Sequence, residues 1–183
     1  VKQKTRKKTG NRWFETQDQI GYYKEFEKEK IVWAELARTG NSFIFDENYY
    51  YTLAGTFILT LNKDDKEIVS YKYLTAMLNN PTTLVYMEYV YSKLDVTGWQ
   101  WKKEPIEKIP IPKASKQDQQ RIILAYDQYI NSNKENKLKY LCELDKLIFD
   151  YYEFNADEIM HIFKKLKVFS SEEQYFTTKI IKM

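Results

Sequence analysis

The stretch Ile109-Pro110-Ile111-Pro112 places the strongest constraint on what this chain can fold into. Each proline lacks a backbone N–H and fixes its own φ, and each pushes the isoleucine before it into an extended conformation. These four residues therefore cannot lie inside a helix or in a central strand. We expect a stiff extended connector here, either at a sheet edge or at the exit from a domain.

The chain before this connector contains strand-like segments. Short runs rich in β-branched and aromatic residues predict three strands, at 30–36, 42–46 and 55–61. The polar residues at 37–41 read as a turn between the first two strands. The charged run at 62–67 follows the third strand, and we expect it to be a hairpin-like connection.

The same part of the chain also contains helix signals. Thr16 to Gln19 has the spacing of a capping box, which predicts a short helix that begins there. A helix is expected at about 70–79, and Asn80 and Pro81 are suited to cap and open the next one, which should reach about residue 94. The first half of the chain therefore mixes helices with strands.

Beyond the connector the pattern is helical. Ser115 is suited to cap a helix, and apolar spacing predicts a second helix at about 135–152. Asn155 and Glu158 form a capping pair for a third helix, and a last short one is expected near Ser170. The prediction is an α+β protein, whose mixed α/β part gives way to a helical spacer or bundle.

These patterns divide the chain into three parts. We expect a basic arm or linker at 1–15, a mixed α/β domain at 16–114 and a helical spacer region at 115–183. The length of 183 residues is enough for one such domain with a helical addition.

Composition excludes several classes of function. Cys142 is the only cysteine and His161 the only histidine, so neither a disulfide framework nor a Cys/His zinc site can form within the chain. The 5 glycines include no Gly-rich phosphate loop. We find no catalytic residue and no metal ligand to nominate. The sequence also lacks a signal peptide and an apolar run of membrane-spanning length, which predicts a cytoplasmic protein without a membrane partner.

Positive charge is concentrated at the start of the chain. The net charge is only +3, yet the first twelve residues carry several cations and no acid. One interpretation is a disordered tail or linker without a binding role, and the other is an arm that lies near phosphates. The candidates for phosphate contact in this arm are Arg6, Lys7, Lys8 and Arg12.

A first polar cluster lies in the turn between two predicted strands, at Arg38, Thr39 and Asn41. Arg and Asn can hydrogen-bond base edges in a bidentate manner, and Thr can contact a thymine methyl group. These three residues are therefore candidates for reading DNA bases. The alternative is that they only stabilise the turn.

A second cluster lies just before the connector. If this stretch is a strand, Trp99, Trp101 and Lys103 share one face, and Gln100 and Lys102 share the other. Gln100 is a candidate for base reading, Lys102 and Lys103 are candidates for phosphate contact, and the two tryptophans would support them.

Four segments resemble, in the expected order, the C-terminal specificity domain of type IIG restriction–modification enzymes and TaqI-like adenine methyltransferases. Glu29 replaces a proline that is usual in the first of these segments, which is a modest departure. The segments are RWFETQDQIGYYKEFEKEKIVWAEL at 12–36, YLTAMLNNPTTLVYM at 73–87, GWQWKKEPIEKIPIPK at 98–113 and LDKLIFDYYEFNADEI at 144–159.

The resemblance implies recognition of a duplex DNA target on behalf of a methyltransferase domain, and in many members an endonuclease, encoded upstream. It implies S-adenosylmethionine as a cofactor of the parent protein, with Mg²⁺ where that protein is a nuclease, and a bacterial or archaeal cytoplasm. No cofactor is expected in this chain, which lacks the Asn-Pro-Pro-Tyr loop of those methyltransferases and should neither methylate nor cleave alone.

Two other interpretations remain open at this point. Half of a type I specificity subunit would have a similar recognition domain followed by long helices, although the ending at 144–159 favours type IIG. A protein–protein adaptor would use the 16 tyrosines to bind a partner chain. Salt-dependent binding to duplex DNA would separate the adaptor from both DNA-binding alternatives.

Overall fold

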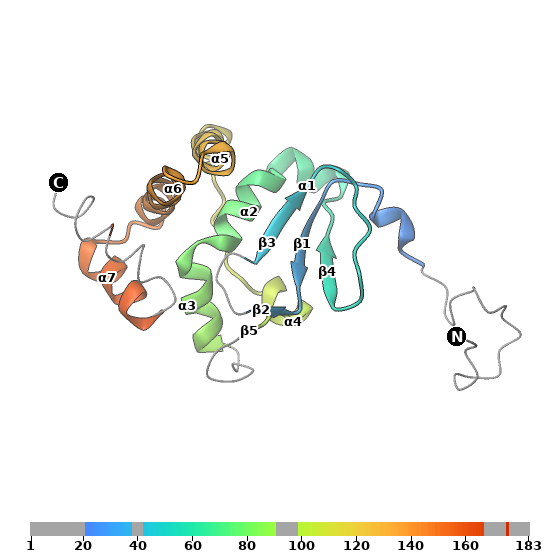
Figure 1. The fold of residues 1–183 in the computed structure, drawn as a ribbon, viewed down its shortest axis with the longest axis horizontal. Coiled ribbons are helices and arrows are strands. Elements are labelled where there is room, and N and C mark those ends of the chain that lie inside the picture. The colour runs from blue at the N-terminus through green and yellow to red at the C-terminus, as the bar shows by residue number, and fades with distance from the viewer. Residues whose placement is uncertain (1–20, 38–41, 91–98, 167–174, 176–183) are drawn as a thin grey trace, which may run out of the picture.

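The computed structural model describes residues 21–37, 42–90, 99–166 and 175, with Trp99 described through its backbone alone. Within these ranges the fold is α+β, as predicted, with a small sheet towards one end and the last three helices at the other (Figure 1). The predicted arm at 1–15, the capping box at Thr16 and the short helix near Ser170 lie outside the described residues.

The sheet is built around β1 (Lys30–Ala34), which pairs antiparallel with β3 (Phe43–Asp46) on one side and β4 (Thr56–Leu59) on the other. These are the three strands that the sequence predicts. The end of the first predicted strand separates as β2 (Leu36–Ala37), which pairs with β5 (Trp99–Gln100) in a second, two-stranded sheet.

One face of the main sheet belongs to the core. Ile31 and Trp33 of β1 are buried there with Phe43 of β3, and Phe57 of β4 stacks on the Trp33 ring at 5.7 Å. Ile44, which points to the other face because side chains alternate along a strand, is 65% exposed. The sheet therefore has one covered face and one open face.

The helices account for most of the remaining described chain. Helix α2 packs against β3 and α5, and α3 packs against α7 (Figure 1). Ser70 and Ser115 cap α2 and α5, and Asn155 with Glu158 forms the predicted capping box of α7. The helices are α1 (Lys63–Ile68), α2 (Tyr71–Asn79), α3 (Pro81–Val90), α4 (Lys103–Glu107), α5 (Lys116–Asn131), α6 (Lys137–Tyr151) and α7 (Ala156–Lys165).

Two local predictions are wrong, and a third, the first helix, falls partly on residues 16–20, outside the described part of the chain. The charged run at 62–67 is not a hairpin-like connection but helix α1, because the Asn62 side chain accepts from the Asp65 N–H and caps it. The described part of the expected first helix is only a 3₁₀ turn, η1 (Tyr23–Glu25). The strand expected to reach Lys103 ends at Gln100, and α4 follows with a proline in its first turn, where a missing N–H costs little.

The proline-rich connector pairs with no described strand and instead lies against helices. Its prolines lack N–H groups but keep their carbonyls, which need donors when they are removed from water. Tyrosine hydroxyls donate to both proline carbonyls and to the lysine carbonyls at either end of the connector. Burial raises the pKa of Tyr152 to about 12 and also raises the pKa of Tyr73, so both hydroxyls stay protonated. The bonds run from Tyr86 to the Lys108 carbonyl (2.9 Å), Tyr152 to Pro110 (3.3 Å), Tyr73 to Pro112 (2.9 Å) and Tyr151 to Lys113 (3.3 Å).

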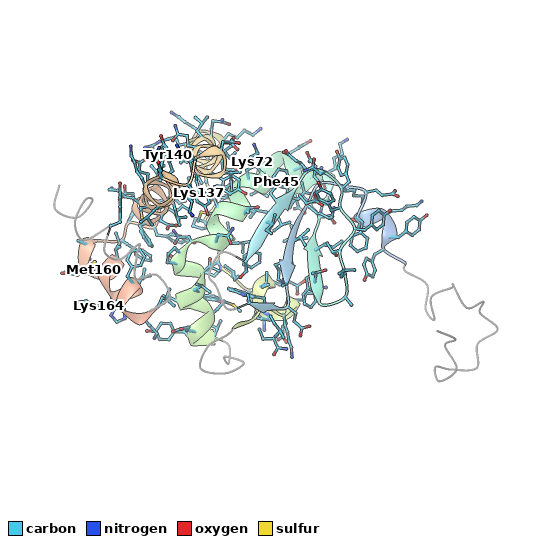
Figure 2. All side chains as sticks on the ribbon, in the orientation of Figure 1. Phe45, Lys72, Lys137, Tyr140, Met160 and Lys164 are labelled. Atoms are coloured by element: carbon cyan, nitrogen blue, oxygen red, sulfur yellow. The ribbon has the colours of Figure 1, made fainter. Side chains whose placement is uncertain are left out.

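Polar contacts join the helical segment to the part of the chain before the connector. Lys72 on α2, labelled in Figure 2, donates to Asp127 on α5 at 2.7 Å. The Gln119 amide of α5 donates to the Ile68 carbonyl and accepts from the Ser70 N–H. Helix α5 is therefore fixed in position at the start of α2.

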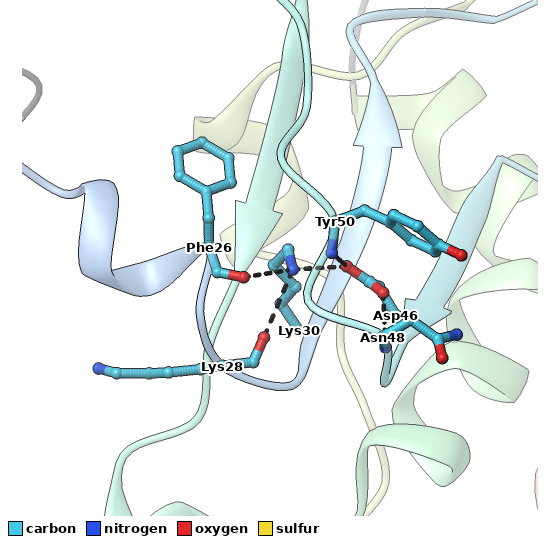
Figure 3. A network of polar contacts seen from close by, with 6 residues as sticks. All are labelled: Phe26, Lys28, Lys30, Asp46, Asn48 and Tyr50. Atoms are coloured by element: carbon cyan, nitrogen blue, oxygen red, sulfur yellow. Dashed lines mark hydrogen bonds and ion pairs between the residues drawn. The ribbon is translucent and has the colours of Figure 1, made fainter.

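A buried ion pair closes one end of the main sheet (Figure 3). Lys30 is fully buried and lies 2.5 Å from the carboxylate of Asp46, its cross-strand neighbour. Lys30 also donates to the Phe26 carbonyl at 2.8 Å, while Asp46 accepts from the N–H groups of Asn48 and Tyr50 at 2.9 Å each. We call this arrangement the Lys30–Asp46 clamp, because it holds the chain on either side of the sheet end.

The Asp46 carboxyl group titrates under opposing influences. Burial acts to raise its pKa, but the hydrogen bond from Lys30 and those from the Asn48 and Tyr50 amides outweigh burial, so the pKa lies below its usual value. The Asp46 carboxyl group is therefore ionised at neutral pH.

Candidate nucleic-acid interface

Strands β2 and β5 bring the chain that leads into the first predicted polar cluster beside the chain that carries the second. Ala37 is paired with Trp99, and Leu36 with Gln100. Residues 38–41, which carry Arg38, Thr39 and Asn41, follow β2 directly but lie outside the described residues. The structure thus places the chain that leads into the first cluster beside the chain that carries the second. We call this place the β2–β5 corner.

Trp101 anchors the corner from inside the protein. Its side chain is fully buried and meets Phe43 edge-on at 5.2 Å. The backbone N–H of Trp101 donates to the Glu35 carbonyl at 2.7 Å, and its backbone carbonyl accepts from the Trp33 indole N–H at 3.0 Å. Trp101 therefore supports β5 as part of the core. It does not share an exposed strand face with Lys103, as the sequence suggested.

Gln100 is held in a defined orientation. Its side-chain amide donates at 2.8 Å to the carboxylate of Glu35, the residue that precedes β2. This bond leaves the amide oxygen and a second N–H without a partner among the described residues. One acceptor and one donor are what a bidentate contact with adenine requires. Glu35 was not predicted from the sequence, because the pairing of β2 with β5 was not foreseen.

The lysines of the corner lie in an exposed, mixed environment. Lys103 pairs with Glu107 at 3.4 Å, and Lys108 pairs with Glu104 at 2.8 Å, all with side chains that are at least 60% exposed. Hydrogen bonding to Lys108 lowers the pKa of Glu104 and correspondingly raises that of Lys108. Such exposed pairs contribute little to stability, so these lysines can change partner at small cost.

Lys102 differs from its neighbours. Its side chain is exposed, and it forms no ion pair with the described residues. It precedes α4 directly, and its N–H donates to the Gln100 carbonyl at 3.1 Å. Lys102 is therefore the described lysine at the corner whose charge is not already matched.

The remaining predicted contact residues cannot be placed. Arg38, Thr39 and Asn41 lie outside the described residues, and so does the basic arm with Arg6, Lys7, Lys8 and Arg12. Nothing is described of the Trp99 side chain. Their roles stay predictions.

Sequence reasoning also missed a group of exposed aromatic side chains near the start of the described chain. Tyr22, Tyr50 and Tyr51 are each more than half exposed. The signal was present in the paired and tripled tyrosines at 22–23 and 49–51. These residues belong to neither of the two predicted clusters.

Comparison with known families identifies the chain. The TaqI-like C-terminal specificity domain family matches residues 1–111, which is more than half of the sequence. The chain belongs to this family of specificity domains. Membership gives it a role in the DNA-sequence specificity of a methyltransferase-type enzyme. No curated protein matches the chain.

None of the helices among the described residues has the length and apolar character that a membrane span needs. In the same part of the chain, no three His, Cys, Asp or Glu side chains are grouped so that they could hold a metal ion.

Proposed function

We propose that this chain recognises a specific duplex DNA sequence for an adenine DNA methyltransferase of the type IIG kind, encoded upstream in the same protein. The observation that carries the proposal is the β2–β5 pairing, which sets the chain entering Arg38–Asn41 beside Gln100 in a member of a specificity-domain family. The expected setting is a bacterial or archaeal cytoplasm.

The proposal divides the work between two kinds of contact. Arg38, Thr39, Asn41 and Gln100 would read base edges, since Arg forks and side-chain amides match them. The lysines would contact phosphate, which fixes position without reading sequence. These phosphate candidates are Lys102, Lys103 and, in the arm, Arg6, Lys7, Lys8 and Arg12.

The chain itself would neither transfer a methyl group nor cleave DNA. S-adenosylmethionine would bind to the upstream methyltransferase domain, and Mg²⁺ to any endonuclease domain there. Labelled methyl transfer from S-adenosylmethionine to DNA by the purified chain alone would contradict this part of the proposal.

The first test is the salt dependence of binding to duplex DNA. Each phosphate that a lysine neutralises contributes about −0.9 to the log–log slope of affinity against salt. Lys102→Ala should therefore flatten the slope by about one contact and weaken cognate and random duplexes alike. Lys139→Ala on α6, another exposed lysine, is the matched control. Affinity that does not change between low and moderate salt would overturn DNA binding.

The second test separates base reading from turn stabilisation. Arg38→Ala or Asn41→Ala in the parent enzyme should cost about 1–3 kcal/mol at the cognate site and relax one base position. Each variant is measured on the cognate duplex and on single mismatches, together with its melting temperature. Equal losses on every duplex, or a loss explained by melting temperature, would restrict these residues to a structural role.

A further inference from the structure

A groove of about 750 Å³ lies beside β4. Strand β4 is at the edge of the main sheet that is away from α5, α6 and α7 (Figure 1). One wall is the 3₁₀ turn η1 with the residues around it, and the other is the chain from Tyr51 to Thr60. We call it the β4 groove. Its main apolar lining residues are Tyr22, Tyr23, Phe26, Tyr51, Leu53 and Ile58.

Several side chains that line the β4 groove are apolar and exposed. Tyr22 is 59% exposed, Tyr51 62% and Leu53 86%. Single exposed apolar residues are ordinary, but a contiguous group that borders a hollow marks an interaction site. Tyrosines suit such a site, because each offers a broad apolar ring and a hydroxyl at its tip.

Among the described residues, one acid and one base line the β4 groove, Glu25 and Lys103. Glu25 pairs with Lys28 and accepts from the Thr60 hydroxyl at 2.7 Å, and these hydrogen bonds lower its pKa. Lys103 also lines the groove, and its exposed pair with Glu107 can open at small cost. A DNA surface needs several cations, and Lys103 is the only one among the described residues that line this groove. The balance favours an apolar, nearly neutral partner, and therefore a protein.

The edge of β4 is open towards the groove. Among the described strands, β4 pairs only with β1, so its other edge has no strand beside it. An unpaired edge presents backbone donors and acceptors to which an extended segment of another chain can add. The aromatic side chains of the opposite wall would then cover the added segment.

Both walls are fixed before any partner arrives. The Lys30–Asp46 clamp holds the Phe26 carbonyl on one wall and, through the Tyr50 N–H, the loop that leads to Tyr51 on the other. Tyr51 stacks on Phe26 at 5.3 Å. A preformed groove binds at lower entropic cost than one that must be ordered during binding.

The position of the groove along the chain indicates which partner would bind there. The described fold begins at Gly21, and Tyr22 of the groove follows immediately, so the upstream domain of the proposed function would be joined to the chain on this side. A domain tethered at this point has a high effective concentration at the groove, so it needs only a small interface.

We propose that the β4 groove is the docking site of the upstream methyltransferase domain, which adds an extended apolar segment to the open edge of β4. The inference rests on the proposed function, because that function supplies the upstream domain. Docking there would fix the position of the β2–β5 corner relative to the catalytic domain.

The test compares hydrogen exchange in the full-length parent protein with exchange in this chain alone. Amides at 22–26 and 51–60 should gain about tenfold protection when the upstream domain is present, while amides of α5 and α6 should not change. Equal exchange of the groove amides in both proteins would overturn the proposal.

A pair of variants then tests the apolar contact itself. In the parent protein, Leu53→Glu should remove the protection and lower the methylation rate about tenfold, which corresponds to 1.4 kcal/mol of lost coupling. Leu124→Glu, at a leucine that is 56% exposed on α5, is the control and should change neither quantity. Protection that survives Leu53→Glu would count against docking in the groove.

Two further measurements exclude the other occupants. Light scattering should find this chain monomeric, because a dimer that Leu53→Glu dissolves would assign the groove to a second copy. The DNA affinity of this chain should not change with Leu53→Glu, because a loss would assign the groove to DNA. If the chain bound no DNA while the parent still showed the protection, the proposed function would fail and the docking site would remain.

Discussion

The two ends of β1 use charge in opposite ways. At its start, the Lys30–Asp46 clamp is buried and fully hydrogen-bonded. Beyond its end, the β2–β5 corner carries exposed pairs such as Lys103–Glu107, whose side chains are 73% and 60% exposed. Ion pairs of the same chemistry therefore lie within one small domain in two very different environments.

The two kinds of ion pair differ in whether one ion can separate from its partner at low cost. A buried ion that loses its partner stays in a poorly solvated place, so the clamp must remain closed. An exposed pair exchanges its partner for water or phosphate at little cost. We infer that the clamp end maintains shape, while the corner end keeps its charges available for a ligand.

The largest expected effect comes from breaking the clamp on one side. Asp46→Ala should lower the free energy of unfolding by about 3–5 kcal/mol, because it leaves Lys30 buried without its counter-ion. Urea denaturation of the chain measures the loss. The double variant Lys30→Met, Asp46→Leu removes both charges and should lose less. A single variant within about 1 kcal/mol of the parent sequence would show that the clamp is not a structural element.

Acid should weaken the same end of the sheet. The pKa of Asp46 is lower in the folded protein than in the unfolded chain, so its stabilisation is fully present above the unfolded value and is lost as pH falls through the folded one. Stability should therefore decline below about pH 4. The decline should be shallower in the double variant that lacks both charges, and identical pH profiles would contradict this origin.

The same comparison of buried with exposed contacts applies to the tyrosine hydroxyl groups that donate to the connector. Tyr73→Phe should cost about 1–3 kcal/mol, because it leaves the Pro112 carbonyl without a donor at a buried ring. Tyr151→Phe removes a longer and more exposed bond to the Lys113 carbonyl and should cost less than about 0.5 kcal/mol. Thermal denaturation of the two variants gives the difference, and equal losses would argue against burial as its cause.

The smallest effect on stability is expected at the corner. Glu107→Gln should change the free energy of unfolding by less than about 0.5 kcal/mol, since its partner Lys103 remains in water. The same change frees the lysine for phosphate, so DNA binding should become tighter at low salt. Glu143→Gln on α6, which releases Lys139 in the same way, is the matched control and should leave DNA binding unchanged.

Local patterns were enough to predict much of the fold. The β-branched and aromatic runs predict all three strands of the main sheet, and the capping residues Ser115 and Asn155 predict where α5 and α7 begin. These features depend on neighbours within a few residues. Helices α1 and α4 were missed, because short charged or proline-containing helices have no apolar face long enough to recognise.

The site was less predictable, because it depends on contacts between distant residues. The partnership of Gln100 with Glu35 spans 65 positions in the sequence, and the clamp joins Lys30 to Asp46 across two strands. Trp101 was expected to support a surface and proved to be a core residue, because tryptophan suits either role and only the fold decides between them. The sequence indicates which residues have suitable chemistry, but not how they are oriented.

The hydroxyl groups that hold the connector have a consequence for how this segment can change through evolution. Four tyrosines, three on α2, α3 and α6 and one just after α6, donate to the carbonyls of Lys108, Pro110, Pro112 and Lys113, so these four carbonyls have donors at fixed positions along the chain. A substitution within the segment would leave most of these matches in place. Insertion or deletion of one residue would misalign the carbonyls that follow it, so the length of the segment should vary less than its composition.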